Sequence, residues 1–469
     1  MKLTLQKTII FASIISFVIA SCATVVTPTI QATVCTGENC LPPTITPVIK
    51  PVPTLTPTIS LGESRQIASG KVVTFWHSYP LSSSGAINIL IDDFNANNHD
   101  GIKVVQKAFF TDNQLELALS ETNADAEQPD VVMGESDLLF AMDTQKPSPN
   151  LVNYLSDPII GLSGDQQKGI RQENWDNLTH DGRLVGIPAQ RDALILLYNQ
   201  SWANSLGFNT PPDTFDEFTL QAKAAFDANI YHQEKTMRGT GGWLIDIHPE
   251  TALAWMGTDF DFNDQENVFS QPVVQEMFTK LKEQEMIGHA WLGKNEDPIP
   301  YFVNRQALFI SALSSEIPEL IIHMKALQMK DEWSTIPYPQ FSDSANDVSK
   351  GYSFGLLAKK KEQQMAGWLF IQWMMKPEHQ AYIGANQFTI PMDQMAVDQL
   401  INFGNESQLI EALRLMTVNA GDFPSSSNWI LARSILSDGF RQLFQPETTI
   451  DMLPAIIDEM DQTYSDYRN

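Results

Sequence analysis

Two hydrophobic periods alternate along the chain just after residue 70. Short runs rich in β-branched and aromatic residues predict three strands, at 71–76, 102–106 and 130–133. The two segments between them, 84–97 and 114–122, carry apolar side chains three and four positions apart, which predicts amphipathic helices. Strands that alternate with helices in this way favour a parallel sheet covered by helices on both faces.

Polar side chains follow the ends of the first and third predicted strands. They are His77, Ser78, Tyr79, Glu135 and Ser136. Ligands of open α/β sheets bind beside the carboxyl ends of strands, so these side chains are candidates to contact a ligand. Glu135 or Ser136 could instead cap the helix that follows the third strand, and His77 could be a hydrogen-bonded turn residue.

The N-terminus has the pattern of an exported lipoprotein. Lys2 and Lys7 precede an uncharged run, 8–20, which is long enough for the core of a signal peptide and too short to span a bilayer. The small residues before Cys22 resemble the lipobox of bacterial lipoproteins. We therefore expect 1–21 to be a cleaved signal peptide and Cys22 to carry a lipid anchor. The alternative is an ordinary secretory signal with a chance cysteine at its edge.

The composition changes in the next segment. Thr or Pro occupies 17 of the 37 positions between 24 and 60, and only two of these positions are charged. Such a segment has few large side chains to bury and favours extended conformations, so we expect 22–70 to be a tether between the membrane and a folded body. Cys35 and Cys40 lie in this tether, and whether they form a disulfide is left open by their spacing.

The remaining 400 or so residues are too many for one hydrophobic core and suit two lobes. A net charge of −26 argues against nucleic acid as a partner, because phosphates would be repelled over most of the surface. The body has no cysteine, which excludes thiol and cysteine–zinc chemistry there.

We find no motif that indicates catalysis or a cofactor. The sequence has no nucleophile elbow, zinc-binding HExxH, phosphate-binding loop or dinucleotide-binding glycine pattern. The nearest approach, 239–242, follows no predicted strand and is interpreted as a flexible loop. The eight histidines show no metal-ligand spacing. We therefore expect no catalytic residue, metal or cofactor, although spacing alone does not exclude a catalytic carboxylate pair.

From about residue 70 to the C-terminus, the chain resembles the extracellular solute-binding proteins of the maltose-binding type (family 1), which are carbohydrate-binding lipoproteins of ABC transporters. A series of segments in a fixed order carries the resemblance. They are Phe75-Trp76-His77, 181–188, 196–199, Leu206-Gly207, 211–218, Trp333 with 336–339, 351–356, 376–380 and 388–391. One departure is Arg305, which stands at a turn where Gly is usual.

Several of these segments also make local predictions. Asp181-Gly182 is expected to form a turn between two strands, and Ile187-Pro188 to end a strand. Pro211-Pro212 should lead into a helix capped by Asp213 or Thr214. The segment 302–311 resembles a strand that places small polar residues beside the ligand.

The resemblance implies the type II periplasmic-binding-protein fold. In this fold, two α/β lobes, each a mainly parallel sheet flanked by helices, are joined by hinge strands, which we expect near Gln190, Gly351 and Phe388. The expected N-terminal lobe comprises 71–187 and 352–394, and the expected C-terminal lobe comprises 188–351 and 395–469.

Aromatic rings pack against the C–H faces of sugars, whose hydroxyl groups need oriented polar partners. On this basis and on the resemblance, we expect the ligand to contact Trp76, His77, Ser78, Tyr79, Glu135, Ser136, Gln190, Arg191, Trp255, Ser311, Tyr352, Ser353 and Trp429. The cleft should be walled by rings such as Trp76 and Trp429. Core packing is the alternative for a helical tryptophan such as Trp255, and Arg191 could instead pair with Asp192.

These observations predict the substrate-binding lipoprotein of an ABC importer. It would capture a sugar or oligosaccharide by closing its lobes, leave it unchanged, and deliver it as a monomer to the transmembrane subunits of a permease. An anionic solute fits the acidic chain less well, unless a local arginine such as Arg191 or Arg433 reverses the charge. The alternatives are a secreted lipoprotein glycoside hydrolase and a sensory solute-binding protein.

Overall fold

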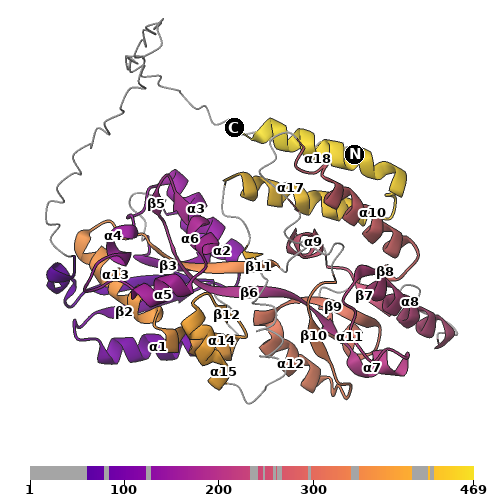
Figure 1. Cartoon of the computed structure of the whole chain (residues 1–469), viewed down its shortest axis with the longest axis horizontal. Coiled ribbons are helices and arrows are strands. Elements are labelled where there is room, and N and C mark those ends of the chain that lie inside the picture. The colour runs from indigo at the N-terminus through magenta and orange to yellow at the C-terminus, as the bar shows by residue number, and fades with distance from the viewer. Residues whose placement is uncertain are drawn as a thin grey trace, which may run out of the picture. The chain divides into compact units, whose positions relative to one another are not determined.

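The computed structural model describes a mixed α/β body (Figure 1). The described residues are 61–78, 84–122, 128–232, 241–246, 249–256, 260, 267–293, 297–339, 348–403, 421–422 and 427–468. Every described residue belongs to the unit that runs from Ile59 to Asn469. The expected lipid anchor Cys22, the cysteines Cys35 and Cys40, and the site candidate Tyr79 lie outside the described residues.

The first half of the fold contains the predicted alternation of strands and helices. β1 pairs in parallel with both β2 and β3, and the helix between β1 and β2 buries its apolar face. The elements are η1 (Leu61–Ala68), β1 (Val72–His77), α1 (Ser84–Asn97), β2 (Lys103–Ala108), α2 (Asp112–Ser120), β3 (Val131–Glu135), α3 (Ser136–Gln145), α4 (Val152–Leu155), α5 (Gly164–Gly169), α6 (Gln172–Asp176), β4 (Thr179–His180), β5 (Arg183–Leu184), α13 (Lys361–Met374) and α14 (Pro377–Gln387).

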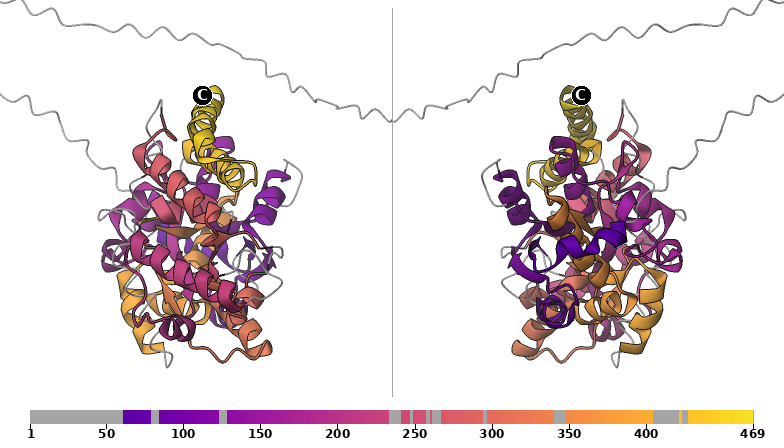
Figure 2. Two further views of the ribbon diagram at one scale, coloured as in Figure 1. Left: turned by 90° about the vertical axis from the view of Figure 1, so that its right-hand side faces the viewer. Right: turned by 90° about the vertical axis from the view of Figure 1, so that its left-hand side faces the viewer.

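The second half of the fold is built around β7, β8 and β9, where β7 pairs in parallel with both neighbours. Its C-terminal helix α18 lies along α17 in all three ribbon views (Figures 1 and 2). The elements are α7 (Gln200–Ser205), α8 (Phe215–His232), β7 (Gly241–Leu244), α9 (Pro249–Met256), α10 (Pro272–Met286), β8 (Ala290–Trp291), α11 (Ile299–Val303), β9 (Ala307–Leu313), η4 (Ser314–Glu316), α12 (Ile317–Ala326), β10 (Ser334–Ile336), β13 (Gly421–Asp422), α17 (Ser427–Leu443), η5 (Ile450–Met452) and α18 (Leu453–Tyr467).

Two long strands connect these halves into one sheet. β6 (Ile187–Tyr198) is buried along its whole length and pairs antiparallel with β11 (Val348–Leu356). The strand order β2-β1-β3-β11-β6-β9-β7-β8 therefore runs from one half to the other through the β11–β6 pair. The short strand β12 (Ile390–Pro391) also pairs with β6 and leads into α15 (Gln394–Phe403).

The hydrophobic core is divided at this connection. The first core cluster includes Ala189 of β6 and resumes at Tyr352 of β11, whereas Leu194 of β6 belongs to the second cluster. We call the elements packed on the first cluster the first lobe. The second lobe comprises the elements packed on the second cluster or on a third core cluster, which begins at Ala193.

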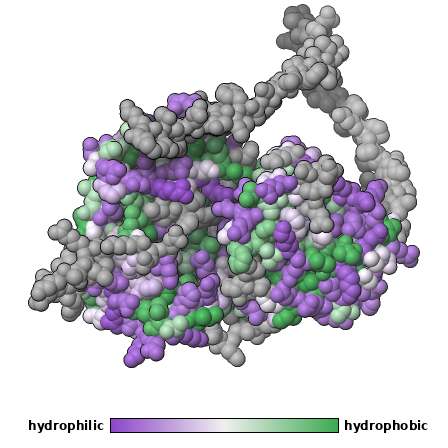
Figure 3. All heavy atoms as spheres, turned by 180° about the vertical axis from the view of Figure 1, so that it is seen from behind, coloured by the Kyte–Doolittle hydropathy of each residue, from purple (hydrophilic) through white to green (hydrophobic). Residues whose placement is uncertain are grey.

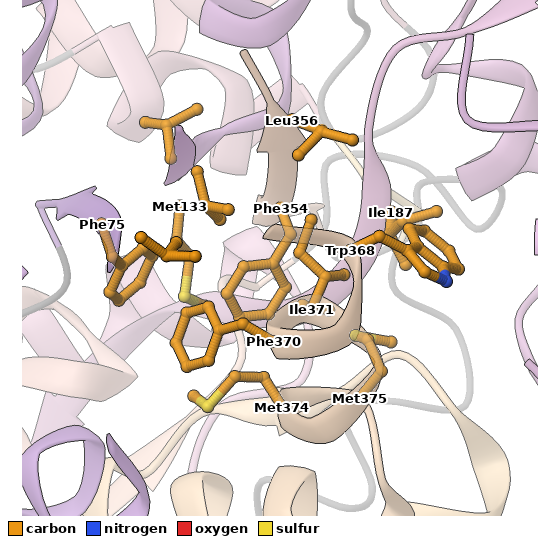
Figure 4. Packing of buried hydrophobic residues seen from close by; sticks show 14 of the residues in the cluster. Phe75, Met133, Ile187, Phe354, Leu356, Trp368, Phe370, Ile371, Met374 and Met375 are labelled. Carbon is orange, nitrogen blue, oxygen red and sulfur yellow. The ribbon is translucent and has the colours of Figure 1, made fainter. Parts of the chain in front are cut away.

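Packing of the first lobe depends on chain segments that are far apart in sequence. Phe75 of β1 meets Phe370 of α13 edge to face, with ring centroids 5.2 Å apart, and its ring lies 6.1 Å from Phe354 of β11 (Figure 4). In the second lobe, Trp255 packs against Phe218 and Trp243 at centroid distances of 5.1 and 5.4 Å. Each lobe thus has its own aromatic core.

The folded body begins earlier than the sequence suggested. Residues 61–68 form η1 inside the expected tether, and Ala68 is fully buried in the first core. Arg65 of η1 donates two hydrogen bonds to Asp100, at 2.7 and 3.0 Å. The expected end of the tether at residue 70 is therefore too late.

Three other local expectations need correction. Ile187-Pro188 begins β6 rather than ending a strand. Proline has no N–H to donate, and Pro188 is tolerated there because it lies where the pairing register between β6 and β11 shifts. The segment 302–311 divides into the end of α11 and the start of β9, since prolines favour the first turn of a helix there. In the segment 239–242, expected to be a flexible loop, Gly241-Gly242 instead begin β7, and 239–240 lie outside the described residues.

The lobe boundary expected at residue 394 falls at the start of α15, which contacts both lobes. α15 packs against α14 and α5 of the first lobe, with Leu400 buried beside Ala381 and Ala396, whereas its Val397 belongs to the core cluster that begins at Ala193. The boundary at residue 394 therefore stays a prediction.

Two expected turns are formed. Asp181 and Gly182 have φ values of 50° and 73° and join β4 to β5. Arg305, with φ 53°, adopts the left-handed conformation for which glycine is usual, and its guanidinium donates two hydrogen bonds of 2.7 Å to Asp331. This contact compensates for the strained backbone of the turn.

The helix after Pro211-Pro212 starts as expected. Thr214 accepts a hydrogen bond from the amide of Glu217, and the Glu217 carboxylate accepts one from the amide of Asp213. Such reciprocal bonds stabilise the first turn of α8.

The surface of the body is mainly hydrophilic on the face shown in Figure 3, where hydrophobic residues lie in separate patches. Among the described helices, none is both long enough and apolar enough to cross a membrane.

Candidate functional site

The three segments expected to form the hinge lie side by side. Arg191 of β6 is the register partner of Gly351 on one side and of Ile390 on the other. Gln190 has the corresponding partners Tyr352 and Pro391. The backbone therefore crosses between the lobes in three adjacent strands at Gln190 and Arg191.

Buried hydrogen bonds fix this crossing. Ser136 and Ser353 share a hydrogen bond of 2.8 Å between their hydroxyl oxygens. The side-chain amide Nε2 of Gln190 donates to Oε1 of Gln380 at 2.6 Å, and the Thr389 hydroxyl donates to Oε1 of Gln190 at 3.0 Å. The side chains of the candidates Ser136, Ser353 and Gln190 are thus hydrogen-bonded within the protein at the crossing.

A charge cluster lies next to the crossing. Lys350 of β11 contacts Asp112 of α2 at 2.8 Å and Glu135 of β3 at 2.5 Å. Arg433 of α17 contacts the other oxygen of Glu135 at 2.9 Å and Asp137 of α3 at 3.2 Å. We refer to these five residues as the charge cluster. It joins three carboxylates of the first lobe to one cation on the connecting strand and one on the second lobe.

Two further sequence candidates converge on this cluster. Tyr352 donates its hydroxyl hydrogen to Asp112 at 3.1 Å, and Ser78 donates to the other oxygen of Asp112. Asp112 therefore links Ser78, Tyr352 and Lys350, although the sequence alone did not identify it. Its position in the first turn of a helix capped by Thr111 is where an acidic residue is ordinary.

Electrostatics separate the three carboxyl groups. Burial and the neighbouring Glu135 raise the pKa of Asp112 to about 6 and that of Asp137 to about 7. Burial alone would also raise the pKa of Glu135, but Lys350 and Arg433 lower it to about 2. Near neutral pH, Glu135 is thus the ionised centre of the cluster, and its neighbours titrate within the physiological range.

A second acidic group lies on the other side of Lys350. The buried Asp192 accepts hydrogen bonds from the hydroxyl of Ser314 at 2.8 Å and from the amide of Ser315 at 2.9 Å. Burial raises the pKa of Asp192, and these hydrogen bonds oppose the rise. Burial also raises the pKa of Glu316 to about 7.

A pocket opens beside the charge cluster, with an empty volume of about 330 Å³ that includes space open to solvent. The first lobe contributes most of its lining, and α17 of the second lobe contributes the rest. The lining residues are Asp112, Asn113, Glu116, Glu135, Asp137, Leu138, Ala141, Ile430 and Arg433. The carboxylates of this pocket can accept hydrogen bonds from the hydroxyl groups of a solute, and the guanidinium can donate hydrogen bonds to them. Within the described part of the chain, no group of three His, Cys, Asp or Glu side chains is placed to hold a metal ion.

The aromatic candidates are distributed over the two lobes. Trp76 is half-buried against the first core, with its ring 5.4 Å from that of Phe109 and 4.5 Å from the Lys107 ammonium. Trp255 and Trp429 are fully buried in the second core. Trp429 directly precedes Ile430, which lines the pocket. The wall of rings expected around a cleft does not line this pocket, because none of the lining residues is aromatic.

The remaining candidates lie on three different strands. His77 is buried at the end of β1, with Nε2 3.1 Å from the Gln106 side chain. Ser311 lies on β9 opposite Leu196 of β6. Arg191 is buried, and its neighbour Asp192 bonds to the two serines described above.

Two α/β lobes, connected by adjacent strands and sharing a polar pocket, define a two-lobed binding protein. The family of bacterial extracellular solute-binding proteins matches residues 90–402, which is more than half of the chain. The chain belongs to this family, in agreement with the resemblance found in the sequence. A comparison with curated proteins found no match.

Solved structures of several proteins share this fold. The GacH receptor of Streptomyces glaucescens matches with a TM-score of 0.68 and 16% identity over 85% of this chain and 100% of its own. The cyclic alpha-maltosyl-1,6-maltose binding protein of Arthrobacter globiformis has a TM-score of 0.67 and 15% identity, covering 84% of this chain and 99% of its own. UgpB of Mycobacterium tuberculosis has a TM-score of 0.68 and 15% identity, covering 84% and 98%. At these identities, the similarity concerns the two-lobed fold.

Proposed function

We propose that this protein is the substrate-binding lipoprotein of an ABC importer and that it captures a sugar or oligosaccharide without transforming it. The observation that carries the proposal is a polar pocket lined from both lobes in a member of the solute-binding family. A solute in this pocket would contact the first lobe through Glu135 and the second through Arg433. Contacts of this kind stabilise a closed form only if they are better than in the open form.

The proposed movement is a rotation of the lobes about the strands that meet at Gln190 and Arg191. Few backbone segments cross there, and they run side by side. Small changes in the dihedral angles of such segments can swing one lobe against the other. The closed form would then present the surface that the permease recognises.

The proposed solute class follows from the lining of the pocket. Four carboxyl side chains and one guanidinium line it, so the pocket suits a neutral, hydroxyl-rich molecule better than an anion. Among the similar structures, GacH is described in complex with acarbose, and the Arthrobacter protein is named as a cyclic alpha-maltosyl-1,6-maltose binding protein. UgpB is described in complex with glycerophosphocholine, so a ligand screen should also include a glycerophosphodiester.

The remaining parts of the proposal concern the ends of the chain and its partners. Cys22 would carry the lipid anchor outside the cytoplasm, and the Thr/Pro-rich segment would separate the body from the membrane. The protein would act as a monomer with the transmembrane subunits of a permease. No sequence motif for catalysis accompanies the pocket, and we therefore propose a binding protein rather than an enzyme.

A thermal-shift screen against a carbohydrate library tests this function. A ligand present at a hundred times its dissociation constant adds about 2.7 kcal/mol of stability, which is readily measured. Calorimetry should then give one site per chain. Turnover of a chromogenic glycoside would indicate a hydrolase instead, and a library in which no sugar, polyol or glycerophosphodiester raises the melting temperature would contradict the proposal.

A matched pair of variants tests the proposed aromatic contact. Trp76 and Trp175 are both half-buried tryptophans packed on the first core. Trp175 lies on α6 and bonds to the Gln167 carbonyl at 3.2 Å. Trp76→Ala should weaken binding of the identified sugar about fivefold, since packing on an aromatic ring is worth about 1 kcal/mol, whereas Trp175→Ala should leave it unchanged. Equal affinities for both variants would exclude Trp76 from the site.

A further inference from the structure

Arg433 connects the two lobes directly. It lies on α17, a helix that packs into the second core through Trp429 and Leu436. Its carboxylate partners, Glu135 and Asp137, lie at the end of β3 and the start of α3, elements of the first lobe. The helices α17 and α3 lie against each other at this point. The two ion pairs therefore span the junction between separate cores.

These ion pairs are shielded from solvent. The exposed fractions of the side chains are 22% for Arg433, 9% for Glu135 and 8% for Asp137. Salt and water screen such pairs less than exposed ones, so their attraction is stronger. A second ion pair on the same helix, between Arg441 and Asp438, has exposed fractions of 61% and 81% and stays within the second lobe.

Lys350 positions the shared carboxylate. It binds Oε1 of Glu135 at 2.5 Å, which leaves Oε2 for Arg433 at 2.9 Å. Because Lys350 is on the strand that crosses between the lobes, Glu135 keeps its orientation when α17 moves. The carboxylate is thus held ready for Arg433.

We propose that Arg433, Glu135 and Asp137 form an ion-pair latch that holds the two lobes together when no solute is bound. A solute must then compete with this latch, because Glu135, Asp137 and Arg433 also line the pocket. The latch lowers the population of the open form and so selects for solutes whose contacts replace the ion pairs. The proposal depends on the two-lobed fold and not on the identity of the solute.

The groups around the latch give its closure a pH dependence. Two elements of the first lobe and the connecting strand face the latch. α2 contributes Asp112 and Glu116, and β11 contributes Lys350 and Tyr352. Beyond Lys350 lie two further acidic residues, Asp192 and Glu316. Burial raises the pKa of Asp137 to about 7 and that of Asp112 to about 6. Opening would expose both carboxyl groups to water and lower their pKa towards ordinary values. Closing therefore takes up protons, and acidification from pH 8 to pH 6 should favour the closed form.

The test measures the distance between the lobes without any solute. Spin labels are placed by Leu117→Cys on α2 and Gln442→Cys on α17, both exposed positions, in the whole chain with Cys22, Cys35 and Cys40 replaced by serine. Electron–electron double resonance then reports the closed and open populations. Arg433→Met removes the latch, and Arg441→Met removes an arginine from the same helix without touching the junction.

The latch predicts a short distance in the parent protein and a closed-to-open ratio lowered about five- to tenfold in Arg433→Met. Arg441→Met should match the parent. Asp137→Asn, which keeps the shape of the side chain, should reduce the change of the closed population around pH 7. The proposal is overturned if Arg433→Met and Arg441→Met give the same distances, or if the parent is already open without solute. A failed sugar screen would leave these results intact, so the two proposals fail separately.

Discussion

Replacing Lys350 with methionine should destabilise the protein in a pH-dependent way. Lys350 lies 2.8 Å from Asp112 and 2.5 Å from Glu135, and all three side chains are largely buried. Removing one partner of a buried ion pair costs about 3–5 kcal/mol, because the other charge stays buried without compensation. Arg433 still compensates Glu135, and Asp112 can take up a proton. We therefore expect a loss of about 2 kcal/mol at pH 7.5.

Lowering the pH should reduce this loss. The pKa of Asp112 is already raised to about 6, and without Lys350 it rises further. At pH 5 Asp112 is then neutral in the variant, and the loss should fall to about 1 kcal/mol. The free energy of unfolding is measured by urea denaturation, with calorimetry in parallel. The double variant Lys350→Met/Asp112→Asn should recover part of the stability at pH 7.5.

Lys223→Met provides the control for this prediction. Lys223 pairs with Asp227 on the exposed surface of α8, so its removal should cost less than about 0.5 kcal/mol at either pH. The reasoning fails if Lys350→Met costs no more than this control, or if its cost is the same at pH 5 and pH 7.5.

Three further substitutions test other parts of the account. Asp137→Asn should become more stable relative to the parent as the pH rises from about 4 to about 7, because only the parent has a buried carboxyl group whose pKa is raised and which must ionise. A pH series of thermal melts measures this, and a constant difference in melting temperature between variant and parent would contradict it. Arg305→Ala should lose about 1 kcal/mol in urea denaturation, since it keeps the strained φ of 53° without the Asp331 contact, whereas Arg305→Gly should remain near the parent; the reverse order would refute the compensation. Gly355→Ala should cost about 1–3 kcal/mol by the same assay, because a Cβ atom there would lie 2.8 Å from the Leu139 side chain and 3.0 Å from that of Val132, and an unchanged stability would show that this core can adjust.

The order of elements in the first lobe could be predicted because the local pattern is strong. The apolar residues of the first predicted helix, Ile87, Leu90, Ile91 and Phe94, are all buried on one side of α1. The division of each lobe between distant parts of the chain came from the family resemblance instead, since no local pattern reports that Phe75 packs against Phe370.

The candidate site could be predicted only in part. Ser78, Glu135 and Tyr352 meet at the charge cluster because they lie at strand ends or on the crossing strand, where sequence reasoning looks for ligands. Asp112, Asp137 and Lys350 escaped notice, since their proximity is tertiary and each is locally ordinary.

The aromatic residues show a different limit of the sequence. A tryptophan in a helix has the same local pattern whether its ring faces a core or a cleft. Trp255 is enclosed by Phe215 and Phe218 of α8, Trp243 of β7 and Tyr338, which follows β10, and no spacing rule connects these positions. Whether Trp429, which is equally buried, contacts a solute stays a prediction.

Hydrogen–deuterium exchange with the identified sugar tests the central claim most directly. If the solute is held between the lobes, the amides of α3 and those of the first turns of α17 should both exchange more slowly in its presence. The amides of α8, which contributes no residue to the pocket, should be unaffected. Protection confined to one lobe, or none at a saturating sugar concentration, would contradict capture between two lobes.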